Sequence, residues 1–454
     1  MTDQLNAQRA FFASGATRDP AFRKRMLQKL QQAITRNERL FYWALHEDLG
    51  KSETEAYLTE IQIVQAEIQT ALRHLDRWVK PKRVPTPVSH FPGKSRVYAE
   101  PYGSVLILSP WNYPFQLALA PLVGALAAGN CAVLKPSASS PNVSGLLRKM
   151  LAETFEEQVV FCVPEETSYA DILSQRYDFI FFTGSARVGR EVMAAAARHL
   201  TPLVLELGGK SPCIVDRHAD LDLAAKRIAW GKLLNAGQTC VAPDYVLADE
   251  AIHDALVHKL ERYCRYFYPN ALENASYPHI VNRRHFDRLC AYLDQTPDKL
   301  GGAVCAERLK IEPTLFPHAC WDDPVMQEEI FGPILPVLTY QTIDDALAEI
   351  QARAKPLALY VFSRDKRFVK QVLNHVSFGG GCVNDTVMHL ANHHLPFGGV
   401  GESGMGRYHG AYSFAAFSHQ KGVFHSGGWP DIPLRYPPFT EDGLKKIKRL
   451  LNCK

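Results

Sequence analysis

The sequence lacks a surplus of either charge. Its 454 residues carry 51 lysines and arginines against 47 aspartates and glutamates, which gives a formal net charge of +4. It also lacks any basic run interleaved with aromatic residues, the pattern that marks a nucleic-acid surface. We therefore expect no nucleic-acid partner.

Long apolar runs and paired cysteines are missing as well. No uninterrupted apolar stretch reaches the ~20 residues that a membrane-spanning helix needs. The first residues, Met1-Thr2-Asp3-Gln4, do not have the basic and then apolar layout of a signal peptide. The ten cysteines are scattered, without a CxxC pair or a metal-like Cys/His spacing. These absences predict a cytoplasmic protein with reduced thiols, no membrane span and no metal site.

The chain is long enough for two to three domains, since 46% of its residues are hydrophobic. Residues 4–79 are expected to be helical. Asp19-Pro20 has the form of an N-cap with proline in the first turn, and Ser52 with Glu55 has the form of a capping box. A core-facing stripe follows at helical spacing: Tyr57, Ile61, Val64, Ile68, Leu72 and Leu75.

Apolar strands alternate with helices in the next part of the chain. The predicted strands are 104–108, 131–134, 159–163, 179–182 and 203–205. Strands that are apolar on both faces and separated by helices indicate a buried parallel sheet, so we predict a doubly wound α/β fold. A second α/β unit follows, with strands at 212–215, 245–248 and 360–362 and helices near 221–234, 250–266, 284–294 and 365–376.

Two segments fall outside this alternation. Residues 81–101 are rich in proline, which suits either an extended arm that reaches a partner subunit or a connecting loop. The tail after Ser426 is proline-rich and ends in a short basic amphipathic helix, about 441–451. At that length we expect a docked terminal helix rather than a membrane anchor.

Cys240 is the strongest candidate for a catalytic group. It sits in Gly237-Gln238-Thr239-Cys240, just after a predicted helix and before a predicted strand. Small and polar neighbours allow backbone N–H groups to surround a sulfur and stabilise a thiolate or an oxyanion beside it. A lone cysteine is more often a small buried hydrophobe, so further motifs have to support this interpretation.

Informative residues also follow three predicted strands of the first sheet, and ligands bind beyond the C-terminal ends of such strands. They are Pro110-Trp111-Asn112-Tyr113-Pro114, Lys135-Pro136-Ser137 and Thr183-Gly184-Ser185. The last of these enters a helix and is suited to a pyrophosphate, although the full GxGxxG fingerprint is absent.

Seven motifs follow one another along the chain: Pro110–Pro114, Lys135–Ser137, Phe182–Ser185, Leu205–Lys210, Gly237–Cys240, Glu329–Pro333 and Pro396–Gly399. In this order they resemble the aldehyde dehydrogenase superfamily over about residues 10–422, and Cys240 through Tyr245 resembles its class 3 branch, which includes fatty and aromatic aldehyde dehydrogenases. The resemblance implies a nucleotide-binding domain (1–80 and 102–207) and a catalytic domain (208–394). It also implies a bridging element for oligomerisation (81–101 and 395–425), with 426–454 as a tail.

The resemblance further implies a role for each site residue. Cys240 is the nucleophile, Asn112 an oxyanion donor and Glu206 the base that activates water. Lys135, Gly184, Ser185, Glu329 and Phe331 bind NAD or NADP, and Tyr113 lines the aldehyde tunnel. Alternatives remain: a CoA-acylating dehydrogenase, which usually lacks the Glu206 base, a cysteine-dependent esterase or thioesterase, and a non-enzymatic protein on this fold.

Two finer expectations follow. Class 3 members are often dimers and lack the longer N-terminal extension of tetrameric branches, so we expect a homodimer. Many NAD-using members continue the Lys-Pro-Ser motif with glutamate, whereas here Ala138 follows Ser137. The missing carboxylate predicts that NADP is used about as well as NAD, or better.

Overall fold

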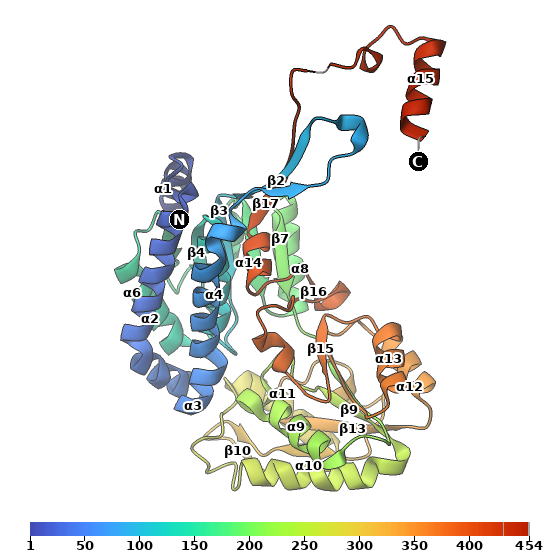
Figure 1. Cartoon of the computed structure of the whole chain (residues 1–454). Helices are drawn as coiled ribbons and strands as arrows, with labels where there is room; N and C mark the ends of the chain where they lie inside the picture. Colours follow the sequence, from blue (N-terminus) through green and yellow to red (C-terminus); the bar gives the residue numbers. More distant parts are fainter. Residues whose placement is uncertain (430, 453–454) are drawn as a thin grey trace.

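The protein is built on two six-stranded sheets with an N-terminal layer of helices (Figure 1). The structure, a computed structural model, describes residues 1–429 and 431–452. Within these residues, no helix has the length and apolar character needed to cross a membrane. The predicted α/β fold class is confirmed.

The first 78 residues form the expected helices. They are α1 (Thr2–Ala13), α2 (Pro20–Leu49), α3 (Glu53–Ala56), a π-helical turn (Tyr57–Ile61) and α4 (Gln62–Trp78). Asp19 caps α2 as predicted, because its side chain accepts a hydrogen bond from the Ala21 N–H. Most of the predicted stripe is buried, but Tyr57 is 42% exposed. The wider π turn shifts the helical register there, which turns Tyr57 outward.

Only half of the predicted capping box forms. The Ser52 hydroxyl accepts from the Glu55 N–H, as expected. The Glu55 carboxylate does not return to Ser52; it accepts a 2.6 Å hydrogen bond from the backbone N–H of Asn235. Glu55 therefore binds the loop that contains Asn235 and not, as local spacing had predicted, the end of its own helix.

The first sheet has the strand order β16-β7-β6-β3-β4-β5. Its strands are β3 (Ser104–Leu108), β4 (Cys131–Lys135), β5 (Val160–Cys162), β6 (Phe179–Thr183), β7 (Leu203–Glu206) and β16 (Gly404–Met405). All pairs are parallel except β16 with β7. Its helices are α5 (Gln116–Ala128), α6 (Pro141–Thr154), α7 (Tyr169–Leu173) and α8 (Ala186–Ala197). This agrees with the predicted series.

The second sheet, of order β12-β13-β9-β8-β14-β15, is parallel throughout. Its strands are β8 (Pro212–Val215), β9 (Tyr245–Asp249), β12 (Thr314–Phe316), β13 (Ile334–Tyr340), β14 (Ala358–Phe362) and β15 (Gly380–Val383). Its helices are α9 (Leu221–Leu233), α10 (His253–Phe267), α11 (Arg283–Gln295), α12 (Ile343–Gln351) and α13 (Lys366–His375). The sequence did not predict β12, β13 or α12; a small hairpin joins β10 (Val304–Cys305) to β11 (Lys310–Ile311).

Residues 81–101 form an arm rather than a simple connection. Strands β1 (Lys82–Val84), β2 (Lys94–Pro101) and β17 (Ser418–His425) form an antiparallel sheet with β2 in the middle. Strand β17 comes directly after α14 (Ala411–Ala416). Figure 1 shows this sheet projecting from the body, with α15 (Glu441–Asn452) standing apart beyond it. The expected docking of the terminal helix is therefore not found on the body of this chain.

Candidate active site

The loop that carries Cys240 is shaped by an unusual backbone. After α9 the chain turns through Asn235 and Ala236, both with φ of +51°, and then through Gly237 with φ of +77°. A Cβ on Gly237 would lie 2.2 Å from the backbone oxygen of Gly332. Glycine is thus required by both conformation and space, and the turn delivers Cys240 to the wall of a cavity.

This cavity has a volume of about 370 Å³ and contains both proposed reactive side chains, Cys240 and Glu206. Tyr113 also lines it, and its hydroxyl lies 2.6 Å from the Thr239 hydroxyl. Most of the remaining wall is apolar: Leu58, Ile63, Leu117, Leu207, Trp230, Leu234, Val241, Leu357, Val387, Met388, Leu390, Ala391 and Phe397.

Glu206 ends β7 and is almost fully buried. Neither of its carboxylate oxygens has a hydrogen-bond partner among the described residues. Burial raises the pKa of this carboxyl well above its ordinary value, because the charged form loses its hydration. A buried carboxyl whose oxygens are free beside a cavity is suited to exchanging protons with what enters.

The Cys240 thiol shares this environment. Burial raises its pKa to about 12, and the charges of Glu329 and Glu206 act in the same direction. The backbone N–H groups of Cys240 and Val241 oppose the shift. Burial thus disfavours the thiolate in the free protein, and the same N–H groups are available to negative charge at the sulfur.

Asn112 lies beside the cysteine loop without lining the cavity itself. Its side-chain Nδ2 donates to the backbone oxygen of Gln238 at 3.0 Å. In return, its own backbone oxygen accepts from Nδ2 of Asn235 at 2.7 Å. These hydrogen bonds join two loops beside Cys240 that are more than 120 residues apart in sequence.

Three of the predicted cofactor residues lie at the ends of β4 and β6, outside the cavity. Lys135 is buried, which lowers its pKa, and among the described residues its Nζ makes only a 3.4 Å contact with the Pro136 oxygen. Ser185 is exposed and caps α8, and Gly184 precedes it. A weakly satisfied cation and an exposed helix N-terminus fit an anionic nucleotide.

Glu329 and Phe331 lie on the loop before β13. Burial raises the pKa of the Glu329 carboxyl to about 8, and the backbone N–H of Gly209 opposes the shift. A Cβ on Gly208 would lie 2.2 Å from this carboxylate, so the two loops are in close contact. Phe331 packs edge-on against Trp111 at 5.4 Å between ring centroids.

The sequence did not identify several parts of the cavity wall. They come from the N-terminal helices (Leu58 and Ile63), from α9 (Trp230) and from the segment 387–391. Helical periodicity assigns such apolar residues to a core and carries no signal for a substrate tunnel.

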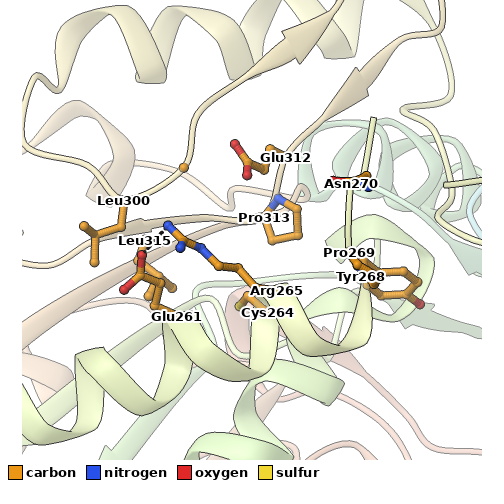
Figure 2. Close-up of a pocket in the computed structure, with 11 residues that line it drawn as sticks. Glu261, Cys264, Arg265, Tyr268, Pro269, Asn270, Leu300, Glu312, Pro313 and Leu315 are labelled. Atoms are coloured by element: carbon orange, nitrogen blue, oxygen red, sulfur yellow. Dashed lines mark ion pairs between the residues drawn. The ribbon is translucent and has the colours of Figure 1, made fainter. Parts of the chain in front are cut away.

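A second cavity, of about 350 Å³, lies beside α10 (Figure 2). The Glu261–Arg265 ion pair and Cys264 line it. Burial raises the pKa of the Cys264 thiol to about 12. None of the predicted site residues lines it, so it is not a competitor for the catalytic site.

Comparison with known proteins supports one family. A sequence model of the aldehyde dehydrogenase family matches residues 4–423. The chain is 47% identical to 4,4'-diaponeurosporen-aldehyde dehydrogenase of Staphylococcus aureus, with 95% of each chain covered. It is 46% identical to human aldehyde dehydrogenase family 3 member B1, covering 98% of this chain and 96% of the relative.

Further comparisons extend this to the whole fold. A rat enzyme named aldehyde dehydrogenase, dimeric NADP-preferring, is 41% identical, covering 96% of this chain and 99% of the relative. The solved substrate-bound state of Staphylococcus aureus AldH superimposes with a TM-score of 0.96 at 45% identity, covering 99% of both chains. By sequence and by fold, this chain belongs to the aldehyde dehydrogenase family, as its motifs predicted.

Proposed function

We propose that this chain oxidises medium- or long-chain aliphatic or aromatic aldehydes to carboxylic acids with NAD or NADP, using Cys240 as nucleophile. The observation that carries the proposal is the shared cavity, in which Cys240 and the unpartnered Glu206 face one apolar space. A nucleophile and a buried base in one apolar site are the parts that this chemistry needs.

Cys240 begins the reaction. Its thiol releases a proton to water, and the thiolate sulfur adds to the aldehyde carbon, which forms a C–S bond and leaves a negative charge on the former carbonyl oxygen. The Cys240 N–H and the Asn112 side-chain amide stabilise that oxygen, an effect worth about 3 kcal/mol per donor in comparable sites. When bound, NAD or NADP supplies the hydride acceptor that converts the adduct into a thioester.

Glu206 completes the cycle. Its carboxylate takes a proton from water, the resulting hydroxide adds to the thioester carbon, and the C–S bond breaks to release acid and thiolate. Both carboxylate oxygens are free for this in the described residues. This also favours water over CoA as the acyl acceptor, since a base beside the cysteine serves hydrolysis.

The cofactor is held by the residues outside the cavity. We assign Lys135 to the adenosine ribose or its phosphate, Gly184 and Ser185 to the pyrophosphate, and Glu329 with Phe331 to the nicotinamide ribose. The buried Lys135 cation and the close packing of Gly208 against Glu329 support these assignments.

The apolar wall of the cavity is suited to an apolar substrate. Tyr113 and the aliphatic and aromatic side chains around Cys240 exclude water and contact hydrocarbon. The Staphylococcus aureus relative is named for a 4,4'-diaponeurosporen-aldehyde, an aldehyde substrate in keeping with such a wall.

We also propose a homodimer. The projecting sheet of β1, β2 and β17 exposes apolar side chains, and the rat relative is named as dimeric.

The test is a panel of short, long-chain and aromatic aldehydes with each cofactor, followed by the absorbance of the reduced nicotinamide. We expect turnover that favours the apolar aldehydes and is abolished in Cys240→Ala, while the variant keeps the folded circular dichroism spectrum. Full dehydrogenase activity in Cys240→Ala would refute the mechanism.

A further inference from the structure

The N-terminal helices contain an ion pair that solvent does not reach. Lys51 Nζ lies 2.6 Å from Oε1 of Glu60, and both side chains are 0% exposed. A buried pair of this kind often contributes no more stability than apolar side chains of the same volume, because both charges lose their hydration. Its contacts with the catalytic loops suggest another purpose.

Lys51 reaches the loop that holds Asn112. Its Nζ donates to the backbone oxygen of Asn112 at 3.2 Å and lies 3.9 Å from the centroid of the Tyr113 ring. With Glu60, the three protons of the ammonium group face a carboxylate, a carbonyl and an aromatic face. Lys51 therefore contacts two successive residues of this loop.

Glu60 fixes the far end of the same loop. Its Oε2 accepts from the backbone N–H groups of Phe115 and Gln116, at 3.0 and 2.9 Å. These N–H groups belong to the start of α5 and have no partner within the helix. Residues 112–116 are thus held at both ends by one buried ion pair.

Glu55 holds the other catalytic loop. Its carboxylate accepts from the Asn235 N–H at 2.6 Å, at the start of the left-handed turn that leads to Cys240. The Asn235 side chain then donates to the backbone oxygen of Asn112, the same oxygen that Lys51 contacts. Both loops consequently meet at a single backbone oxygen.

We propose that Lys51, Glu55 and Glu60 are positioning residues that set the Asn112 amide relative to Cys240. The inference rests on the proposed function, in which that amide stabilises the oxyanion. A displacement of about 1 Å at a reacting group can lower a rate on the order of 100-fold, so a network of this kind acts on kcat without contacting the substrate.

The first test is a double-mutant cycle between Lys51→Met and Asn112→Ala. Alone, Lys51→Met should lower kcat about tenfold or more per folded protein, with KM changed by less than about twofold, because only the transition-state contact is misplaced. In the Asn112→Ala background it should have almost no further effect on kcat, since the group that it positions is gone.

The control is Arg23→Met, which removes another buried cation, one that contacts the Thr17 and Ala127 carbonyls. We expect this change to lower the unfolding midpoint, to leave kcat per folded protein unchanged, and to add independently to Asn112→Ala. Equal behaviour of the two methionine variants would overturn the proposal, because it would reduce Lys51 to a stabilising role.

Glu55 offers a test that does not depend on burying a methionine. Glu55→Ala removes the acceptor for the Asn235 N–H, whereas Glu55→Gln keeps an acceptor oxygen in the same place. We expect Glu55→Ala to lower kcat about tenfold at nearly constant KM and Glu55→Gln to restore most of it. Glutamine no better than alanine would overturn the role of Glu55. Asn112→Ala separates this proposal from the proposed function. If Asn112→Ala keeps full activity, the oxyanion assignment is wrong. If Asn112→Ala is inactive while Lys51→Met and Glu55→Ala are fully active, only the positioning network is wrong.

Discussion

Cys240 must become a thiolate in a site that disfavours negative charge. Burial raises its pKa to about 12, and Glu329 and Glu206 add to the shift. We predict that alkylation of Cys240 by iodoacetamide in the free protein rises about tenfold per pH unit through neutrality, as the thiolate fraction does well below a pKa. The rate is measured as the difference between the natural chain and Cys240→Ala, which subtracts the other thiols. A plateau near neutral pH would show a low-pKa thiol and contradict this prediction.

Glu206 has a raised pKa for the same reason, burial of its charged form. The base is active only when it is ionised, so steady-state turnover should increase as the pH rises through that pKa. Glu206→Gln keeps the shape and removes the base. We expect rapid mixing to give a normal burst of reduced cofactor followed by turnover slowed on the order of 100-fold. If burst and steady state fall together, Glu206 activates the cysteine instead; if neither falls, it has no catalytic role.

Ala138 bears on the choice of cofactor. It is exposed in the turn after β4, close in sequence to the buried Lys135. No carboxylate is present at this position to bind ribose hydroxyls or to repel a 2′-phosphate, so we expect kcat/KM with NADP to equal or exceed that with NAD. Ala138→Glu should shift the preference toward NAD about tenfold, equal to about 1.4 kcal/mol, chiefly by weakening NADP. A strict NAD preference in the natural chain would show that another residue excludes the phosphate.

At the scale of the element, the turn before Cys240 depends on Gly237. An alanine there would have φ of +77° and a Cβ 2.2 Å from the Gly332 oxygen. We predict that Gly237→Ala lowers the free energy of unfolding by about 2 kcal/mol and reduces kcat, because strain and the clash displace the cysteine loop. Denaturant unfolding measures the first effect. Gly145→Ala is the control, since a Cβ there meets nothing within 4 Å inside α6, and alanine should stabilise that helix. Equal stability of the two variants would contradict the argument.

Local patterns predicted most elements of this fold. The strands of the first sheet are apolar on both faces, so 104–108, 131–134 and 179–182 were recognised almost to the residue. Strand β13 was missed although it lies inside the second sheet, because Pro336 interrupts its apolar run and proline is uncommon in central strands. Glu55 was misassigned because its partner, Asn235, is 180 residues away. Motifs brought Cys240, Glu206 and Tyr113 together correctly, whereas the tunnel wall depends on tertiary packing alone.

At the scale of the whole molecule, the site is assembled from nearly the full length of the chain. The cavity uses residues from Leu58 in the N-terminal helices to His409, and the first sheet contributes Thr183 and Glu206 from the ends of β6 and β7. The segment that supplies Phe397 and Tyr408 includes β16 and leads on through α14 into β17 of the projecting sheet. A change in that sheet is therefore connected along the backbone to the tunnel wall.

The projecting sheet is where we place the contact between subunits. Val88 (91% exposed) and Phe91 (74%) lie in the connection between β1 and β2, and Phe424 (45%) lies on β17. Apolar groups gathered on a projecting sheet are typical of an interface, and a two-fold dimer buries two such sheets at once. We predict a dimer by light scattering for the natural chain and a monomer for the double variant Val88→Asp with Phe91→Asp.

The control is Tyr266→Asp. Tyr266 is an aromatic residue as exposed as Phe91, at 74%, but it lies on α10, so this variant should remain a dimer. A dimer that survives the double aspartate variant, or a stable tetramer of the natural chain, would place the interface elsewhere.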